Sequence, residues 1–120
     1  MKLKIFALFL IIFSLSAGAY DACEDAKSSA EELSLSMKGG YKSDTLKNCK
    51  WYASKIYHLR YALEDAQDCN CPDAVTEVSK ALKYGLKAGG FNNLEDCQKY
   101  MKIAFNSASN AYSHASSCQK

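Results

Sequence analysis

Six cysteines in a repeating pattern constrain the fold of this chain more than any other feature of its 120 residues. They are Cys23, Cys49, Cys69, Cys71, Cys97 and Cys118. The first and second lie 26 positions apart, as do the fourth and fifth; the second and third lie 20 apart, and the fifth and sixth 21. This matched spacing predicts an internal duplication, with one repeat at 20–69 and another at 70–120.

The N-terminal stretch, 1–19, has the pattern of a signal peptide. Lys2 and Lys4 precede an apolar run at 5–13, and small residues end at Ala19, where we expect cleavage. A retained membrane anchor is the alternative, although the run is short for a bilayer span. We therefore expect a secreted or periplasmic protein whose mature part, 20–120, is a single helical domain without a membrane span.

The expected mature chain is electrically neutral. Removing Lys2 and Lys4 from the 15 basic residues leaves 13, which equals the 13 acidic residues. A neutral domain lacks the long-range field that captures phosphate backbones, so nucleic acid is not an expected partner. An even number of cysteines in a short exported chain instead predicts a framework of disulfides.

Apolar residues spaced three and four apart predict two helices in each repeat. The expected ranges are 22–38, 45–68, 72–88 and 94–118, and no segment alternates with the period of a strand. Gly39-Gly40 and Gly89-Gly90 are expected to end helices, and Asp44 and Asn93 to cap the following ones. The predicted fold is all-α: two tandem disulfide-stapled helical hairpins that form a four-helix bundle.

The apolar stripes predict the core of this bundle. In the first repeat they comprise Cys23, Ala26, Ala30, Leu33, Met37, Leu46, Cys49, Ala53, Ile56, Leu59, Leu63 and Ala66. In the second they comprise Ala74, Val75, Val78, Leu82, Leu86, Leu94, Cys97, Met101, Ala104, Ala108, Ala111, Ala115 and Cys118. The stripe shifts by one position between Ile56 and Leu59, where the alignment of the repeats also needs its one-residue gap.

Antiparallel hairpins restrict how the cysteines pair. Four cysteines fall at one end of the bundle, whereas Cys49 and Cys97 fall at the other. Helices of about 16 residues span roughly 24 Å, far more than the ~7 Å between the Cα atoms of a disulfide. Cys49 should therefore pair with Cys97. Three pairings of the other four remain open, and we favour Cys23–Cys69 and Cys71–Cys118, each of which closes one hairpin.

The segment 93–100, Asn-Leu-Glu-Asp-Cys-Gln-Lys-Tyr, followed by Ala104 and Ala111, resembles repeats of exported bacterial proteins. Those repeats share a Leu-x-x-Cys-x-x-Tyr core, alanine-rich helices and closing cysteines. The resemblance covers the whole mature chain through its two copies. It implies helices and export, and it implies no particular activity.

No residue pattern predicts catalysis, a cofactor or a metal centre. His58 follows Ser54 by four positions and His114 follows Ser113 by one, but chance explains such pairs in a serine-rich chain. Carboxylates gather at the end that holds four cysteines: Asp21, Glu24, Asp25, Asp65, Asp68 and Asp73. Calcium binding there is the alternative to the usual role of acidic residues at helix N-termini.

Trp51, His58 and Tyr61 are the candidate binding residues. At 100° per residue they share the side of their predicted helix that faces away from Cys49. The corresponding positions of the second repeat are polar, so the fold does not require aromatic residues there. Trp and Tyr are frequent in binding hot spots. We therefore expect a non-enzymatic binding or inhibitor-like module with an unknown protein partner, or alternatively a carrier of a small apolar ligand.

Overall fold

The computed structural model describes residues 21–119, and every regular element within that range is helical. The five helices are α2 (Ala22–Tyr41), α3 (Leu46–Tyr57), α4 (Tyr61–Asp68), α5 (Pro72–Ala88) and α6 (Leu94–Cys118). The all-α prediction is confirmed. The predicted signal peptide and its cleavage site after Ala19 lie outside the described residues.

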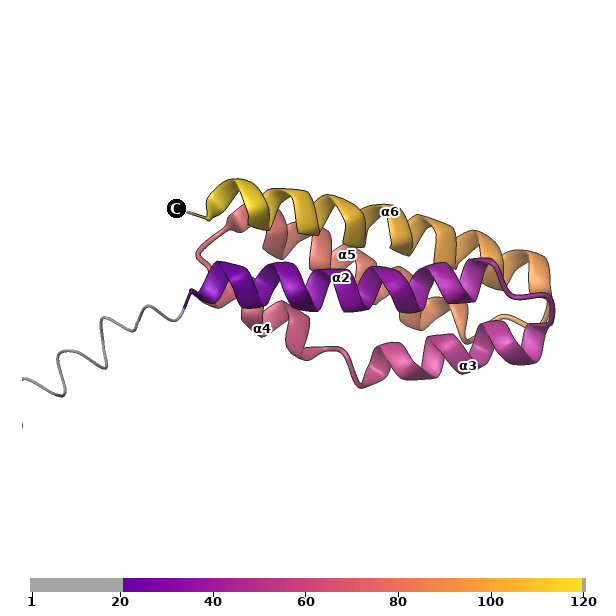
Figure 1. The fold of residues 1–120 in the computed structure, drawn as a ribbon. Helices are drawn as coiled ribbons and strands as arrows, with labels where there is room; N and C mark the ends of the chain where they lie inside the picture. Colours follow the sequence, from indigo (N-terminus) through magenta and orange to yellow (C-terminus); the bar gives the residue numbers. More distant parts are fainter. Residues whose placement is uncertain (1–20, 120) are drawn as a thin grey trace, which may run out of the picture.

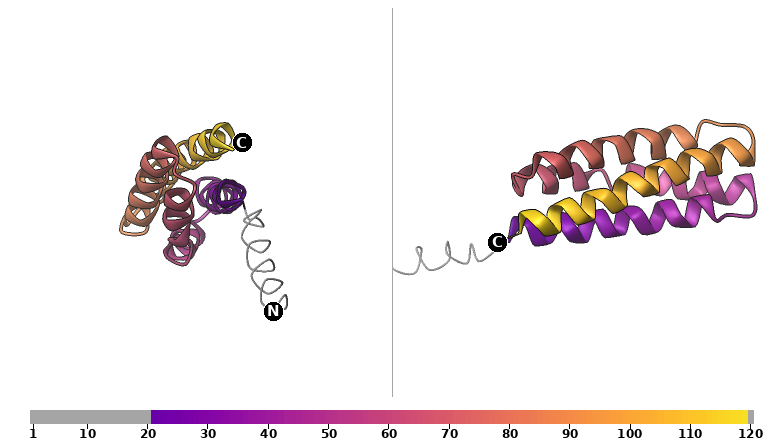
Figure 2. Two further views of the ribbon diagram at one scale, coloured as in Figure 1. Left: turned by 90° about the vertical axis from the view of Figure 1, so that its left-hand side faces the viewer. Right: turned by 90° about the horizontal axis from the view of Figure 1, so that it is seen from above.

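The helices run lengthwise; α3 and α4 share one direction, which is antiparallel to α2 and α5, and α6 is antiparallel to α5 (Figure 1). α6 packs along both α2 and α5, while α3 and α4 follow one another along the remaining side and each contacts α2 and α5. Seen from above, α6 runs obliquely and its C-terminal end lies beside α2 (Figure 2). Because α6 is oblique, its N-terminal part also contacts α3.

Small residues predominate in the core, and most predicted stripe positions belong to it. Six predicted positions are half-buried and pack against it instead: Leu46, Leu59, Leu63, Val75, Leu94 and Cys118. Every predicted position in α2 is buried, and α6 is buried from Cys97 to Ala115 at each predicted position. Leu86 is a correction, because 38% of this residue is exposed. The buried side of α5 instead includes Ala81, Gly85 and Ala88. Leu86 therefore faces solvent.

The prediction of one continuous helix over 45–68 is wrong, because the helix is interrupted between Tyr57, where α3 ends, and Tyr61, where α4 begins. The amides of His58 and Leu59 donate to carbonyls three residues earlier, and those of Ala62 and Leu63 do the same. Such bonds form a tighter turn than the α-helix. The interruption coincides with the shift in the apolar stripe after Ile56. After it, α4 is oriented so that Ala62 and Ala66 are buried in the core.

Gly39-Gly40 does not end the first helix, which continues to Tyr41. Among the described residues no glycine has a positive φ. These glycines instead permit close packing: a Cβ on Gly39 would lie 2.4 Å from the ring of Tyr52, and one on Gly40 would lie 2.6 Å from Met101 Cε. Gly89 directly follows the end of α5, as predicted.

Capping residues fix where α3 and α6 begin. Asp44 is not the cap of α3; Thr45 is, because its extended backbone lets its side chain accept from the Asn48 amide. Asn93 caps α6 as predicted, and it accepts from the Asp96 amide at 2.8 Å. Thr45 and Asn93 lie 48 positions apart, which is the shift that relates the predicted repeats.

All six cysteines form disulfides, and the pairing is the one favoured from the sequence. Cys23 bonds Cys69 and Cys71 bonds Cys118 at one end, with Cα separations of 4.5 and 6.0 Å. Cys49 bonds Cys97 at the other end, with Cα atoms 6.3 Å apart. Between α4 and α5, Asn70 adopts φ of 57°, a conformation that asparagine tolerates better than most residues.

Candidate functional site

Six large apolar side chains are strongly exposed among the described residues. Four of them belong to α2, α3 and α4, and we call this group the aromatic strip: Leu35, Trp51, Tyr57 and Tyr61. Their exposed fractions range from 44% to 59%. On α5 and α6 the corresponding residues are Leu86 and Tyr112, which are less exposed at 38% and 39%. The strip is therefore the best candidate for an interaction surface.

Trp51 lies on the outer side of α3, as predicted, and 53% of it is exposed. Its ring meets Tyr52 edge to face at a centroid distance of 4.8 Å. Lys55, one helical turn later, places its Nζ atom 4.7 Å from the Trp51 ring centroid. This cation–π contact orders a lysine and an indole together at the surface.

His58 is exposed just beyond the end of α3 and lines a hollow of about 290 Å³. The hollow lies between α2 and α3, and its lining residues are Glu32, Leu35, Ser36, Lys55, His58 and Leu59. Tyr57 packs against the His58 ring at 5.7 Å, and the Arg60 guanidinium lies 3.9 Å from the centroid of Tyr57. At the C-terminal end of α3, Tyr57 thus contacts both an imidazole ring and a guanidinium group.

Tyr61 opens α4, so the interruption separates it from the helix that carries Trp51. It lines a neighbouring hollow that shares Glu32 and Leu35 with the hollow beside His58. Its hydroxyl donates to the carboxylate of Glu32. The structure therefore brings His58 and Tyr61 to adjoining hollows, whereas Trp51 borders a separate hollow and connects to them through Lys55.

Sequence reasoning missed two members of the strip and its two stacked cations. Leu35 lies two positions after the buried Leu33, and this off-stripe apolar residue was a usable signal. Tyr57 directly follows the buried Ile56 and was a similar signal. No local pattern could have indicated that Lys55 and Arg60 stack on rings, because stacking depends on the rotamers that these side chains adopt.

The Tyr61–Glu32 hydrogen bond raises the pKa of Tyr61 to about 12. Ionisation of the phenol would remove the bond and place two negative groups together. We expect the absorbance titration of the wild type, minus that of Tyr61→Phe, to show a midpoint near pH 12. Glu32→Gln should move this midpoint towards the ordinary tyrosine value of about 10.

Because the pKa of Tyr61 is higher in the folded than in the unfolded protein, the free energy of unfolding depends on pH. The Tyr61–Glu32 bond contributes its full stabilisation below about pH 10 and loses it as the pH rises through about 12. Stability measured across this interval should fall more in the wild type than in Tyr61→Phe. A midpoint for Tyr61 near 10 in the wild type would contradict the bond.

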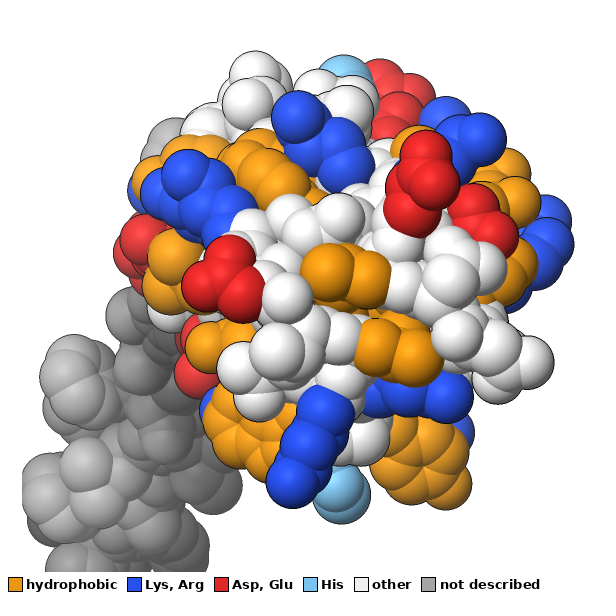
Figure 3. All heavy atoms as spheres, turned by 90° about the vertical axis from the view of Figure 1, so that its right-hand side faces the viewer, with side chains coloured by type: hydrophobic (Ala, Val, Ile, Leu, Met, Phe, Trp, Pro, Cys, Tyr) orange, Lys and Arg blue, Asp and Glu red, His pale blue; other side chains and the backbone are white. Residues whose placement is uncertain are grey.

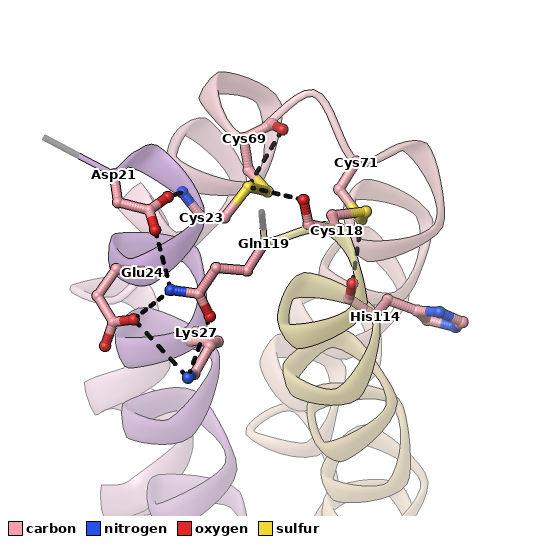
Figure 4. The surroundings of a disulfide bond; sticks show 9 residues. All are labelled: Asp21, Cys23, Glu24, Lys27, Cys69, Cys71, His114, Cys118 and Gln119. Carbon is pink, nitrogen blue, oxygen red and sulfur yellow. Dashed lines mark hydrogen bonds and ion pairs between the residues drawn. A yellow bond between two sulfur atoms is a disulfide. The ribbon is translucent and has the colours of Figure 1, made fainter. Parts of the chain in front are cut away.

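The end that holds four cysteines contains a polar cluster that ties the C-terminal residues to α2 (Figure 4). The amide nitrogen of Gln119 donates to Asp21 at 2.9 Å and to Glu24 at 2.6 Å, while its oxygen accepts from Lys27. The bond from Gln119, together with those from the amides of Cys23 and Glu24, lowers the pKa of Asp21. The sulfur–carbonyl approaches in Figure 4 are contacts, because a disulfide sulfur carries no hydrogen.

Two of the carboxylates considered for calcium, Asp21 and Glu24, are thus engaged with Gln119. Within residues 21–119 no three acidic, histidine or cysteine side chains converge as metal ligands would. The Ser54 hydroxyl donates to the carbonyl of Trp51 at 2.7 Å. A nucleophilic serine would instead donate this proton to a base such as His58.

The opposite end of the molecule, which holds the α2–α3 and α5–α6 connections, is chemically mixed (Figure 3). Its apolar side chains form small patches separated by lysines, carboxylates and polar groups, so no broad apolar surface is present on this face. Among helices α2 to α6, none combines the length and apolar character needed to cross a membrane.

Comparisons with known proteins found no matching family model, no matching curated protein and no matching solved structure. The resemblance to exported bacterial repeats with a Leu-x-x-Cys-x-x-Tyr core therefore stays a prediction. Functional inference has to rest on the chain's own residues.

Proposed function

We propose that the mature chain is a secreted, non-enzymatic binding or inhibitor-like module whose protein partner covers the aromatic strip. The observation that carries the proposal is the exposure of Leu35, Trp51, Tyr57 and Tyr61 on α2, α3 and α4. Exposed aromatic residues accompanied by arginine are typical of binding hot spots. The hollows beside Trp51, His58 and Tyr61 give a partner's side chains places to enter.

At the level of architecture, we regard α3 and α4 as one interrupted helix, so that the chain forms a four-helix bundle of two tandem hairpins. The disulfides Cys23–Cys69 and Cys71–Cys118 support this view, because they span 46 and 47 positions and close corresponding hairpins. The repeats would then be 20–69 and 70–120. A rigid scaffold of this kind would hold the aromatic strip in one arrangement.

Export through the signal peptide 1–19 is part of the same proposal. Three disulfides within residues 21–119 are compatible with an oxidising compartment, where such bonds form and persist. A secreted or periplasmic location would also bring the strip into contact with other exported or surface proteins.

A carrier of a small apolar ligand is the alternative function, and it would need space inside the bundle. Packing at the centre argues against such space. A Cβ on Gly85 would lie 2.8 Å from Ile56 Cδ1 and 3.0 Å from Met37 Cε, and one on Gly40 would lie within 3 Å of three Met101 atoms. We therefore favour the binding module.

Replacement of Trp51 separates a binding role from a structural one. We expect Trp51→Ala to lower the free energy of unfolding by less than about 1 kcal/mol, because half of the side chain is exposed. Denaturant unfolding checks this value. A loss of about 3–5 kcal/mol, typical of a buried tryptophan, would show that Trp51 belongs to the core.

Binding at the strip can be tested by a photo-crosslinking residue, benzoyl-phenylalanine, placed at Trp51 or, as the control, at Tyr112 on α6. Both positions are exposed, but only the first belongs to the strip. We expect illumination of the producing culture's medium to give a discrete adduct from position 51 and none from position 112. Equal adducts, or none at either position, would contradict the proposed function.

A further inference from the structure

Positive charge is concentrated on the helix that carries Trp51. The segment 46–60 contains Lys47, Lys50, Lys55 and Arg60, and it contains no aspartate or glutamate. Three of these side chains are exposed and Lys50 is half-buried. Since the expected mature chain is neutral overall, this local excess of positive charge is balanced by acidic residues elsewhere in the molecule.

The cations of this segment form no ion pair within the described part of the chain. Within residues 21–119 one ion pair is present, and it joins Lys27 to Glu24 on α2 at 3.7 Å. Lys55 and Arg60 lie instead over the rings of Trp51 and Tyr57. Stacking restrains a cation while its outward N–H groups stay available, and a guanidinium can then bind a carboxylate through two parallel hydrogen bonds.

Lys55 lines the hollow between α2 and α3. Leu35 and Leu59 supply apolar surface, and Lys55 and His58 contribute its α3 side. Glu32 also lines it, and its carboxylate accepts the Tyr61 hydroxyl. A volume of about 290 Å³ is at the lower edge of the usual range for small-molecule sites. The hollow is therefore suited to one apolar side chain surrounded by negative groups.

We infer that the partner presents an acidic polypeptide segment with a single large apolar residue. Its carboxylates pair with Lys47, Lys55 and Arg60, and its apolar side chain enters the hollow between α2 and α3. This inference rests on the proposed function and names the chemistry of the partner. A polysaccharide or a nucleic acid would match the charge, but neither has an apolar side chain for the hollow.

The test uses the full mature protein and a short synthetic peptide of glutamates interrupted by one leucine. Trp51 is the sole tryptophan, so its fluorescence reports binding at the strip without a label. We expect saturable quenching or shift of the emission at low salt, with weaker binding as salt is added. Peptides with glutamine in place of glutamate, or serine in place of leucine, should bind more weakly.

Matched variants separate a local site from general attraction. Lys55→Gln removes a lysine stacked on Trp51, and Lys87→Gln removes one stacked on Tyr100 at 5.3 Å on the other hairpin. We expect the first to weaken binding of the acidic peptide about two- to fivefold, and the second to leave it unchanged. Equal losses in both variants would overturn the assignment to α3.

Three further outcomes would overturn the inference. The first is no effect of the acidic peptide on Trp51 fluorescence. The second is tighter binding of heparin or of vesicles that contain phosphatidylglycerol, which would make the ligand a polysaccharide or a membrane. The third is salt-sensitive self-association in sedimentation, which would make the acidic partner a second copy. If crosslinking at Trp51 succeeds while the peptide fails, the proposed function survives and the acidic chemistry does not.

Discussion

Replacing both Cys49 and Cys97 with alanine is expected to lower the free energy of unfolding by about 4 kcal/mol. This disulfide closes a loop with a sequence separation of 48, and loop-closure entropy of the unfolded chain predicts that amount. The bond also joins α3 to α6. Denaturant unfolding of the purified oxidised proteins, with the slope fitted separately for each protein because the crosslink changes the compactness of the unfolded chain, would measure the effect.

The other two disulfides are matched controls, because their separations of 46 and 47 are nearly the same. Loop entropy alone therefore predicts nearly equal losses for all three pairs. Cys49 and Cys97 are fully buried, whereas Cys118 is partly exposed, so packing should make the Cys49–Cys97 replacement costlier than that of Cys71–Cys118. A larger loss from the Cys71–Cys118 pair would contradict this account.

Ile56→Ala is expected to cost about 2–5 kcal/mol of stability. Ile56 is fully buried and meets α2 and α5 beside Met37 and Gly85. Its truncation leaves a cavity between three helices that cannot easily collapse. Leu86→Ala is the matched control, because it removes an apolar side chain from an exposed position on α5 and should cost less than about 1 kcal/mol.

A double-mutant cycle tests the geometry of this contact. A Cβ on Gly85 would lie 2.8 Å from Ile56 Cδ1, which is the atom that Ile56→Val removes. Gly85→Ala should therefore be better tolerated in the Ile56→Val background than alone, with a coupling energy of about 0.5–3 kcal/mol. Additive effects of the two substitutions would show that the helices do not approach as closely as described.

Much of the helical framework could be predicted because its signals are local. Residues three and four apart lie on one side of a helix, so the stripes from Cys23 to Met37 and from Cys97 to Ala115 identified buried positions. The shift in the stripe after Ile56 marked where the second helix is interrupted. The spacing also placed four cysteines at one end of the bundle and two at the other, which was enough to predict the Cys49–Cys97 bond.

The candidate site was predictable only in part. Helical geometry placed Trp51 and His58 on the outer side of α3, and both are exposed. It placed Tyr61 on the same side, and this residue is also exposed. It could not predict that the Tyr61 hydroxyl bonds Glu32, 29 positions earlier, because the interruption puts Tyr61 at the start of α4. Such a contact depends on how α4 lies against α2, and no nearby sequence pattern encodes that relation.

The sequence by itself determined the approximate ranges of α2, α5 and α6, the Asn93 cap and the Cys49–Cys97 bond, since each depends on spacing along the chain. It favoured Cys23–Cys69 and Cys71–Cys118 but left other pairings of these four cysteines open. Tertiary structure decided the rest. The oblique course of α6 brings Cys97 to Cys49, and close helix approach makes Gly40 a packing residue rather than a helix stop. The reason is physical: a helix encodes which of its sides is apolar, but distances between helices depend on side chains from several segments packing at once.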